Sequence, residues 1–518
     1  MDDRADRRHG GVEVPIGRHS IVSSISRPSD DRVPAAGRPP ACRHKRPPGA
    51  RRRSPAQCLM PETPQPRLAA DRVSFIEILG HALANITPSA MATVTISLVV
   101  AQGGLLTWAV YLAVGLVMLL VAAQVAALAH EVPAAGSLFV SVSRSLHPVA
   151  GVLSGWVMTG GYLGALLAAP IVGGLFVAKA LRIAGMGLPW PWAALLFAGI
   201  SWALTVRDVG LATRYSLFVE AISLLIILVI GVWTLGHVSW AEPVLWSDTF
   251  RAGPFFQAMT LSILAYGGFE TAANFGREAH APDRDIPRAI FAAVLVSLGF
   301  YVFMAYVEVA GFGGRVGELA RTPAPLSLLA LRQGLPALAF SSDIAMAIAA
   351  FSATIATLNS LGRVLYSMGR HRVLPAALGE IGVHGTPAVA LHGLGALTCG
   401  FVILAGWRDW SPLVIVDLFG VFTALGFIVI YLFALIAVPV LHRRRGQRVP
   451  WPALAALVLA GPLLVYVFGE NFWGANGVAL TAAYGFLVYL VLGAWLYWVW
   501  RQRADRPAAD LLFARDDD

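Results

Sequence analysis

Two short stretches decide the fold: Leu264-Ala265-Tyr266-Gly267-Gly268-Phe269-Glu270 and Asn85-Ile86-Thr87-Pro88-Ser89-Ala90. Each lies inside a long apolar run, the former within residues 256–276 and the latter within residues 77–101. Proline removes a backbone donor and glycine weakens a helix, so both runs are expected to unwind at these points. Unwound backbone in a membrane has to line a cavity or pack against protein. The two stretches therefore predict two broken membrane helices that enclose a site.

The composition places these runs in a membrane. Of the 518 residues, 57% are hydrophobic and 13% are charged, whereas soluble proteins have roughly 45–50% apolar and about 25% charged residues. A helix needs roughly 20 apolar residues to cross about 30 Å of hydrocarbon. We therefore expect an all-α integral membrane protein with twelve spans, at residues 77–101, 105–129, 149–180, 189–206, 211–236, 256–276, 287–312, 340–368, 386–406, 412–440, 451–468 and 477–500. The broken spans are the first and the sixth, five helices apart, and such pairing points to a transport site between two repeats.

Positive charge predicts the orientation. With the N-terminus inside, most arginines between the spans fall on the cytoplasmic side, including the cluster from Arg443 to Arg448. This is the distribution that the positive-inside rule requires. An even number of spans places both termini in the cytoplasm, and we expect the protein in the inner (cytoplasmic) membrane.

The N-terminal region carries most of the net charge of +9. Residues 1–59 hold 13 Lys and Arg against 6 Asp and Glu, a net charge of +7, so the basicity does not indicate a nucleic-acid partner. Residues 1–72 are expected to be a disordered tail, or upstream sequence before a true start near Met60; a basic arm on anionic lipid is the alternative. The predicted membrane domain is 73–500, with repeats at 77–236 and 256–440, two extra helices at 451–500 and a short cytoplasmic tail at 501–518.

Few residues suggest enzyme or metal chemistry. Cys42 and Cys58 lie in the tail, and Cys399 is alone in an apolar span. No His, Cys, Asp or Glu group has metal-ligand spacing, and no phosphate-binding loop is visible. We expect no cofactor, no metal and no enzymatic activity.

Three stretches resemble the amino acid-polyamine-organocation permease family. The sharpest, from Gly267 to Ile290, is similar to that family's sixth helix and following loop. The second, from Ala356 to Pro387, is similar to the eighth helix and the loop into the ninth, and a weaker third runs from Pro133 to Pro148. The resemblance covers roughly residues 75–500. It implies a LeuT-type five-plus-five inverted repeat with two extra helices, and a small-molecule substrate between the first and sixth helices.

The breaks and the resemblance together mark the candidate substrate-binding residues, which are Ile86, Thr87, Pro88, Ser89, Ala90, Tyr162, Tyr266, Gly267, Gly268, Phe269 and Glu270. Half-helix N-termini attract a carboxylate and C-terminal carbonyls attract an ammonium group. Tyr266 and Phe269 offer a cation–π surface or pack as ordinary aromatics. Glu270 is either a substrate contact or a tie that holds the broken helix. The first break lacks the Gly-Ser-Gly pattern usual in the family, which makes a simple amine without a carboxylate more plausible.

Three residues are candidates for coupling. Glu220 lies inside the fifth span, where burial disfavours a charge, so it is the leading proton carrier; pairing with Arg207 or Arg214 is the alternative. Ser352 and Thr354, with Thr357, are expected to face the first break as a sodium site or to bond their own helix carbonyls.

These features predict a secondary active transporter that moves an amino acid or related small amine by alternating access, with a proton, or else sodium, as coupling ion. An antiporter of two related solutes is the nearest alternative, and a non-transporting membrane sensor of amino acids is a more distant one. The sequence does not predict the oligomeric state.

Overall fold

The computed structural model describes residues 73–131, 137–207, 209–238, 250–276, 279–382, 385–475 and 477–503. The predicted tail at 1–72 and residues 504–518 of the predicted C-terminal tail lie outside these residues. Nearly all of the described chain is helical, and its one strand-like pairing is a bridge between Val73 and Ala279. The α-helices are α1 (Phe75–Ile86), α2 (Pro88–Gly103), α3 (Thr107–Glu131), α4 (Ser137–Ser145), α5 (Pro148–Ile183), α6 (Trp190–Arg207), α7 (Val209–Gly236), α8 (Ala252–Tyr266), α9 (Pro282–Gly311), α10 (Val316–Leu319), α11 (Pro325–Arg332), α12 (Pro336–Arg370), α13 (Ala388–Trp407), α14 (Pro412–Arg444), α15 (Trp451–Trp473) and α16 (Gly477–Arg503). Short 3-10 turns connect some of them: η2 (Gly104–Leu106), η3 (Phe269–Phe275) and η4 (Ala376–Gly379).

Each predicted span falls on a long helix or on a broken pair of helices. Nine helical segments among the described residues are long and apolar enough to cross a membrane. One of them, Phe75–Glu131, holds two predicted spans, whereas α6 and the α8–η3 pair are not among the nine. An all-helical, multi-pass membrane fold is thus confirmed, while the count of twelve and the division into repeats stay predictions. The short helices α4, α10 and α11 were not predicted.

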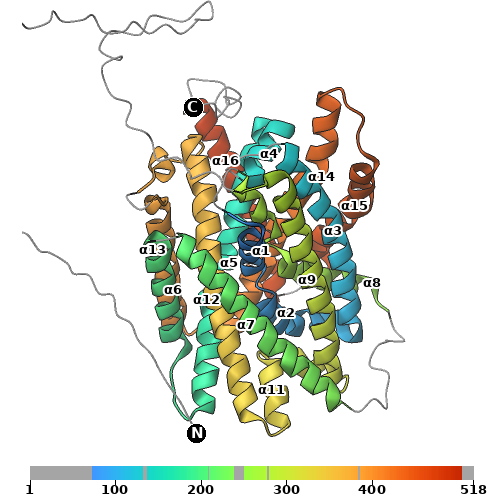
Figure 1. Ribbon diagram of the computed structural model, residues 1–518, viewed down its shortest axis with the longest axis vertical. Coiled ribbons are helices and arrows are strands. Elements are labelled where there is room, and N and C mark those ends of the chain that lie inside the picture. The colour runs from blue at the N-terminus through green and yellow to red at the C-terminus, as the bar shows by residue number, and fades with distance from the viewer. Residues whose placement is uncertain are drawn as a thin grey trace, which may run out of the picture. The chain divides into compact units, whose positions relative to one another are not determined.

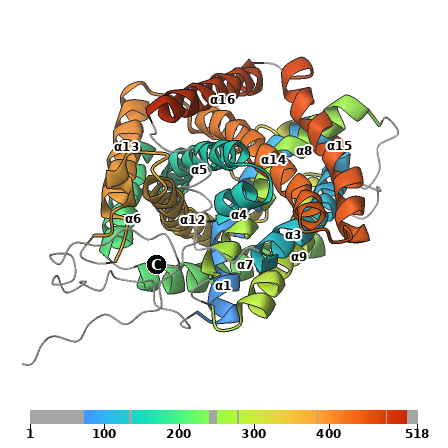
Figure 2. The same ribbon diagram turned by 90° about the horizontal axis from the view of Figure 1, so that it is seen from above.

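The packing is built around α5. This helix lies against α12 and α14 near the centre of the bundle, and α16 stands at its edge (Figure 2). The peripheral helices turn large apolar side chains outward: Val488 and Val491 of α16 are each 69% exposed. In water such a face would be an association surface, but hydrocarbon tails cover it at no cost, as expected for a membrane protein.

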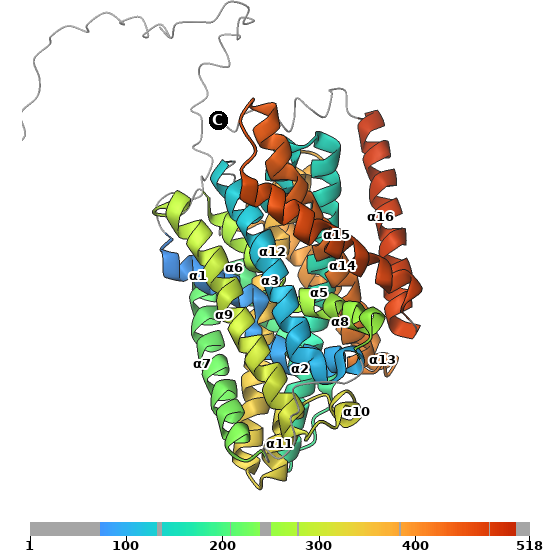
Figure 3. The same cartoon turned by 90° about the vertical axis from the view of Figure 1, so that its right-hand side faces the viewer.

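The two halves of the first span are enclosed by the other helices. α1 and α2 follow each other through the middle of the bundle, and α11 lies at the end toward which α2 points (Figures 1 and 3). Helix α2 packs against α8, while α1 packs against α7 and α9. The junction of α1 and α2 is therefore surrounded by protein.

Candidate functional site

The first break is a single residue. α1 starts at a capping box in which the Ser74 N–H donates to the Glu77 carboxylate at 2.9 Å. It ends at Ile86 because Pro88 has no N–H with which to continue the helix. Thr87 adopts φ 50° and ψ 61°, a left-handed conformation that is an outlier for a β-branched residue. Such strain is typical of functional positions, and here it leaves the start of α2 in the middle of the protein.

The second break uses two glycines. The Gly267 N–H donates to the carbonyls of Ile263 at 3.2 Å and Leu264 at 3.0 Å, which ends α8. Gly268 has φ 119°, and a Cβ atom there would lie 2.8 Å from the carbonyl carbon of Asn85. Only glycine fits that conformation and that distance. The two breaks therefore touch each other, backbone against backbone.

Glu270 fixes the second break to two other helices. It is 2% exposed. One carboxylate oxygen accepts from the Tyr162 hydroxyl of α5 at 2.6 Å; the other accepts from the Tyr431 hydroxyl of α14 at 3.1 Å and the Gly268 N–H at 3.0 Å. Phe269 stacks on Tyr431, with ring centroids 5.4 Å apart. Both oxygens of Glu270 are engaged by protein donors, so the carboxylate ties α5, α14 and η3 together.

Glu220 holds the first break in a similar way. Its Oε1 atom accepts from the Ser89 N–H at 3.0 Å and from the Ser89 hydroxyl at 2.8 Å. A carboxylate at this place interacts favourably with the positive end of the α2 dipole. The side chain is 1% exposed, and its Oε2 atom has no hydrogen-bond partner among the described residues. Glu220 thus has one satisfied oxygen and one that is available.

A cavity begins at the first break and extends along α2. It encloses about 690 Å³ of empty space, part of it open to solvent. Its polar lining consists of one amide and four hydroxyls; the remaining lining is apolar, with alanines of α5 and α12 forming much of the wall, and the polar residues are Asn85, Thr87, Thr95, Thr357 and Thr423. None of the lining residues is charged.

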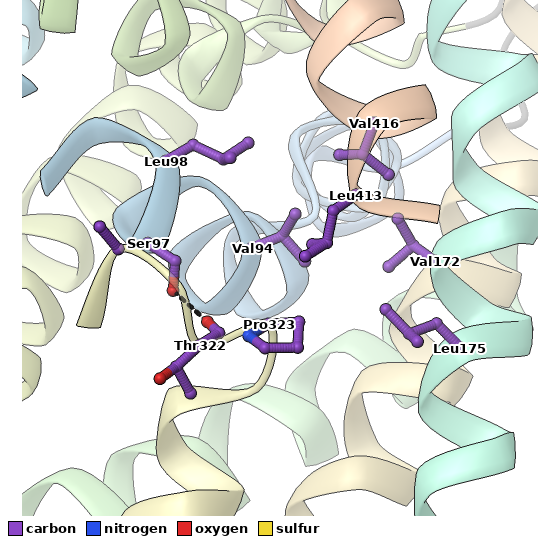
Figure 4. A pocket seen from close by; sticks show the side chains of 10 residues that line it. Val94, Ser97, Leu98, Val172, Leu175, Thr322, Pro323, Leu413 and Val416 are labelled. Carbon is purple, nitrogen blue, oxygen red and sulfur yellow. Dashed lines mark hydrogen bonds between the residues drawn. The ribbon is translucent and has the colours of Figure 1, made fainter. Parts of the chain in front are cut away.

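A second pocket continues this cavity toward the far end of α2. The two share four lining residues: Val94, Leu98, Val172 and Val416. Figure 4 shows the apolar side chains around it, with the Ser97 hydroxyl donating to the Thr322 carbonyl at 2.8 Å. The segment between α10 and α11 therefore forms part of the wall beyond the break.

The α1 side of the break is closed by contacts between elements. Asn85 accepts from the Ser360 hydroxyl of α12 at 3.0 Å, and its amide donates to the His81 carbonyl at 3.0 Å. The Arg363 guanidinium lies 5.2 Å from the centre of the Phe275 ring. The His280 N–H donates to the Val73 carbonyl at 3.1 Å. The cavity therefore extends from the break toward α2 and not toward α1.

The chain matches the amino acid permease family over residues 77–505. It belongs to the amino acid permease family. The resemblance seen in the sequence is thereby confirmed, and the family is one of transporters rather than enzymes.

Individual relatives of this permease are distant. It is 23% identical over 417 residues to the branched-chain amino acid permease BcaP of Lactococcus lactis subsp. cremoris, an alignment that covers 72% of this chain and 86% of that protein. It is 29% identical over 258 residues to the uncharacterised transporter Rv1999c of Mycobacterium tuberculosis, an alignment that covers 49% of this chain and 56% of that protein. It is 25% identical over 282 residues to the uncharacterised amino acid permease YecA of Bacillus subtilis, an alignment that covers 53% of this chain and 63% of that protein. The last two alignments span less than two thirds of the relative.

The predicted substrate residues of the permease fall into three groups. Thr87 and Ala90 line the cavity. Ser89 is bonded to Glu220, and Tyr162 to Glu270. The others are buried around the junction but do not line the cavity, and they are Ile86, Pro88, Tyr266, Gly267, Gly268 and Phe269. In this conformation the cavity adjoins the first break more than the second.

The predicted coupling residues are also separated. Glu220 reaches the first break from α7, and Arg214, one of its two alternative partners, has a side chain outside the described residues. The Thr354 hydroxyl donates to the Ala350 carbonyl of its own helix at 2.8 Å. Ser352 is fully buried on the same helix, and Thr357 lines the cavity.

Three further polar residues that the structure singles out were not among the predicted site residues. Asn85 lines the cavity beside the break, Tyr431 binds Glu270, and Glu308 of α9 is a fully buried carboxyl. Tyr431 gave no signal beyond being a polar group in an apolar run, whereas Asn85 begins the stretch that marks the first break. Glu308 could have been found, because an ionisable residue inside a predicted span is a functional candidate by default.

Proposed function

We propose that this permease moves an amino acid with an uncharged, aliphatic side chain across the cytoplasmic membrane by alternating access, coupled to protons. The observation that carries the proposal is the cavity at the first break, whose lining is apolar and contains no charged side chain. Ligand sites of this kind bind through apolar surface with a few placed polar groups. The printed name of the relative BcaP, a branched-chain amino acid permease, supports the same class.

The polar ends of the substrate meet backbone and hydroxyl groups in this proposal. Pro88 has no N–H, and that of Ser89 is bonded to Glu220. Ala90 is the next residue and lines the cavity, so its N–H is the donor expected to meet a substrate carboxylate. The amide of Asn85 and the hydroxyl of Thr357 lie in the same lining and are suited to the ammonium group.

A simple amine is the second candidate. Glu220 already places a carboxylate at the start of α2, the position where a substrate carboxylate is expected. If Glu220 stays there throughout transport, a substrate without its own carboxylate is favoured.

The proposed architecture is a twelve-helix LeuT-type inverted repeat with both termini in the cytoplasm. In that orientation α2 lies in the outer half of the membrane, so a cavity on the α2 side and contacts on the α1 side are those of an outward-facing state. The segment that connects α10 and α11, which forms part of the pocket wall, then belongs to the outer vestibule. Rocking of one group of helices would close this cavity and open the α1 side.

Glu220 is the proposed proton carrier. Its carboxyl bridges α7 and the start of α2, so gain or loss of a proton changes how firmly the first break is held. Sodium coupling through Ser352 and Thr354, and exchange of two solutes, are the alternatives. If Glu220 carries the proton, Glu220→Gln should retain substrate exchange better than it retains proton-driven substrate accumulation. The glutamine side chain can still accept hydrogen bonds from Ser89, but it cannot carry a proton.

Counterflow in proteoliposomes tests the function. Vesicles are preloaded with one unlabelled solute at a time, and uptake of the same labelled solute is measured. Leucine is compared with isoamylamine, which has the same side chain without the carboxylate; lysine and glutamate are charged controls. Exchange of leucine alone supports the amino acid, and exchange of isoamylamine alone supports the amine. Exchange of lysine or glutamate at the rate of leucine would contradict the uncharged cavity. An imposed pH gradient then decides between proton coupling and exchange.

A further inference from the structure

Glu308 of α9 is a buried ionisable residue that the proposed function does not use. Its side chain is 0% exposed, and neither carboxyl oxygen has a hydrogen-bond partner among the described residues. Removing an unpaired carboxylate from water costs several kcal/mol. A buried group left unsatisfied in this way needs a functional or structural explanation.

A pair of hydroxyls begins at the cavity lining, and one of the two lies near Glu308. Thr95 of α2 lines the cavity, and its hydroxyl is 2.7 Å from the hydroxyl of Tyr111 on α3. The Thr95 hydroxyl donates to the Met91 carbonyl at 2.6 Å, so Tyr111 is the donor to Thr95. Glu308 lies within electrostatic range of Tyr111. Tyr111 thus contacts the cavity lining through Thr95 and lies near the buried carboxyl.

The same tyrosines lead toward Glu220. The rings of Tyr111 and Tyr301 are in contact, with centroids 5.4 Å apart, and Tyr301 lies within electrostatic range of Glu220. Tyr301 and Glu308 are seven residues apart on α9, two helical turns, so they share one face of that helix. Each of the two carboxyls therefore lies near one member of a buried tyrosine pair.

The elements packed on α9 offer Glu308 no ion pair among the described residues. α3 contributes Tyr111, α7 contributes Glu220 and α2 contributes hydroxyls. Tyr266 of α8 contacts the Tyr301 ring of α9. α1 carries His81, and η3 carries Glu270, whose oxygens are bonded to Tyr162, Tyr431 and Gly268. At the end of α9, Arg332 of α11 binds Glu318 of α10 and lies 5.2 Å from the centre of the Phe312 ring. That cation already has a carboxylate partner. The neutral acid is the form of Glu308 that these surroundings accept.

We propose that Glu308 is a second proton-binding site of the transport cycle, reached from the cavity through the hydroxyls of Thr95 and Tyr111. The inference rests on the proposed proton coupling and adds a site to it. A proton from water in the cavity binds the carboxylate and gives the neutral, buried acid of this structure. In the alternate conformation the acid releases that proton to water, and only an O–H bond forms or breaks.

The test compares two transport measurements on Glu308→Gln, which keeps the size of the side chain but cannot exchange a proton. With one coupled proton, each unit of pH gradient supports up to about tenfold accumulation. The variant is expected to lose accumulation at least tenfold at a gradient of two pH units while losing less than about threefold in leucine counterflow. The matched control is Glu470→Gln on α15, a buried glutamate outside this group, which should accumulate substrate like the wild type.

A spectroscopic measurement tests proton binding at Glu308 without measuring transport. Infrared difference spectra of the wild type between acid and alkaline pH should contain a carboxylic-acid C=O band that is missing in Glu308→Gln and present in Glu470→Gln. Tyr111→Phe should keep the band but slow accumulation. Equal accumulation by Glu308→Gln and the wild type, or identical difference spectra, would overturn the second site while leaving the proposed function intact. A wild type that exchanges leucine but never accumulates it would instead refute proton coupling itself, and this site with it.

Discussion

Gly268→Ala is the substitution whose effect is best defined by the structure. Gly268 has φ 119°, and an added Cβ would lie 2.8 Å from the Asn85 carbonyl carbon and 2.9 Å from the Ile86 nitrogen. Both atoms are backbone, so neither can rotate away. The unfavourable φ costs about 1–3 kcal/mol, and overpacking costs a further 1–3 kcal/mol or so. Together about 2 kcal/mol or more acts against the conformation in which the two breaks touch, a factor of roughly 30 in its population.

The assay is the initial rate of leucine counterflow, divided by the amount of protein in the vesicles. We expect Gly268→Ala to lose at least about 30-fold in rate while it still inserts into the membrane and elutes as a single species in detergent. Gly299→Ala on α9 is the control, because a Cβ there meets nothing within 4 Å and alanine favours a helix over glycine by about 1 kcal/mol. A rate for Gly268→Ala within threefold of the wild type would refute the reasoning that transport needs close contact between the breaks.

Four further substitutions test the second break, the cavity wall and the ion pair between α10 and α11. Glu270→Gln should impair transport more than membrane insertion. Tyr431→Phe deletes one hydrogen bond to the Glu270 carboxylate and should lower stability in a detergent thermal melt by about 1.5–3 kcal/mol. An unchanged melt would contradict the inference that Glu270 holds α14 against the second break. Ala353→Leu narrows the cavity, because Ala353 is part of its wall. The KM for leucine should therefore rise more than the KM for alanine. An equal rise for both substrates would show that the substrate side chain does not lie against Ala353. The Arg332 guanidinium lowers the pKa of the exposed Glu318 carboxyl. This pair therefore contributes above the ordinary pKa of Glu and is lost as the pH falls through the lowered one. Glu318→Gln should slightly lower the melting temperature at pH 7, where the pair is present, and leave it unchanged in acid, so that this acid dependence disappears from the melt.

The sequence predicted what is local to the breaks. Pro88 and the pair Gly267-Gly268 limit backbone geometry by themselves, so the interruptions could be placed to within a residue. The helices are likewise visible in apolar runs of sufficient length. The span at 256–276 shows the limit of this reasoning, because its break ends α8 after 15 residues.

The long-range hydrogen bonds that hold the two breaks in place could not be predicted from the sequence. Ser89 and Glu220 are 131 residues apart in the chain, and Tyr162 and Glu270 are 108 apart. Hydrophobic periodicity shows that a helix has an apolar face, but it does not show which helix lies against it. In a membrane that signal is weaker still, since every face of a span is apolar. Partners such as Tyr431 become visible only once α14 is placed beside the second break.

The two carboxylates at the breaks differ in their hydrogen bonds, and under the proposed function this difference suits them to different parts in transport. Glu270 has both oxygens engaged by donors from α5, α14 and its own segment, so moving it would leave a buried charge and two buried hydroxyls unsatisfied. Glu220 uses one oxygen, and the other has no partner among the described residues. Its release from Ser89 would free an N–H at the start of α2, which is what a substrate carboxylate requires. Glu270 is therefore suited to keep the second break rigid, whereas Glu220 is suited to exchange partners. Proton binding at Glu220 and substrate binding at α2 would then be linked, because both act on the same hydrogen bonds.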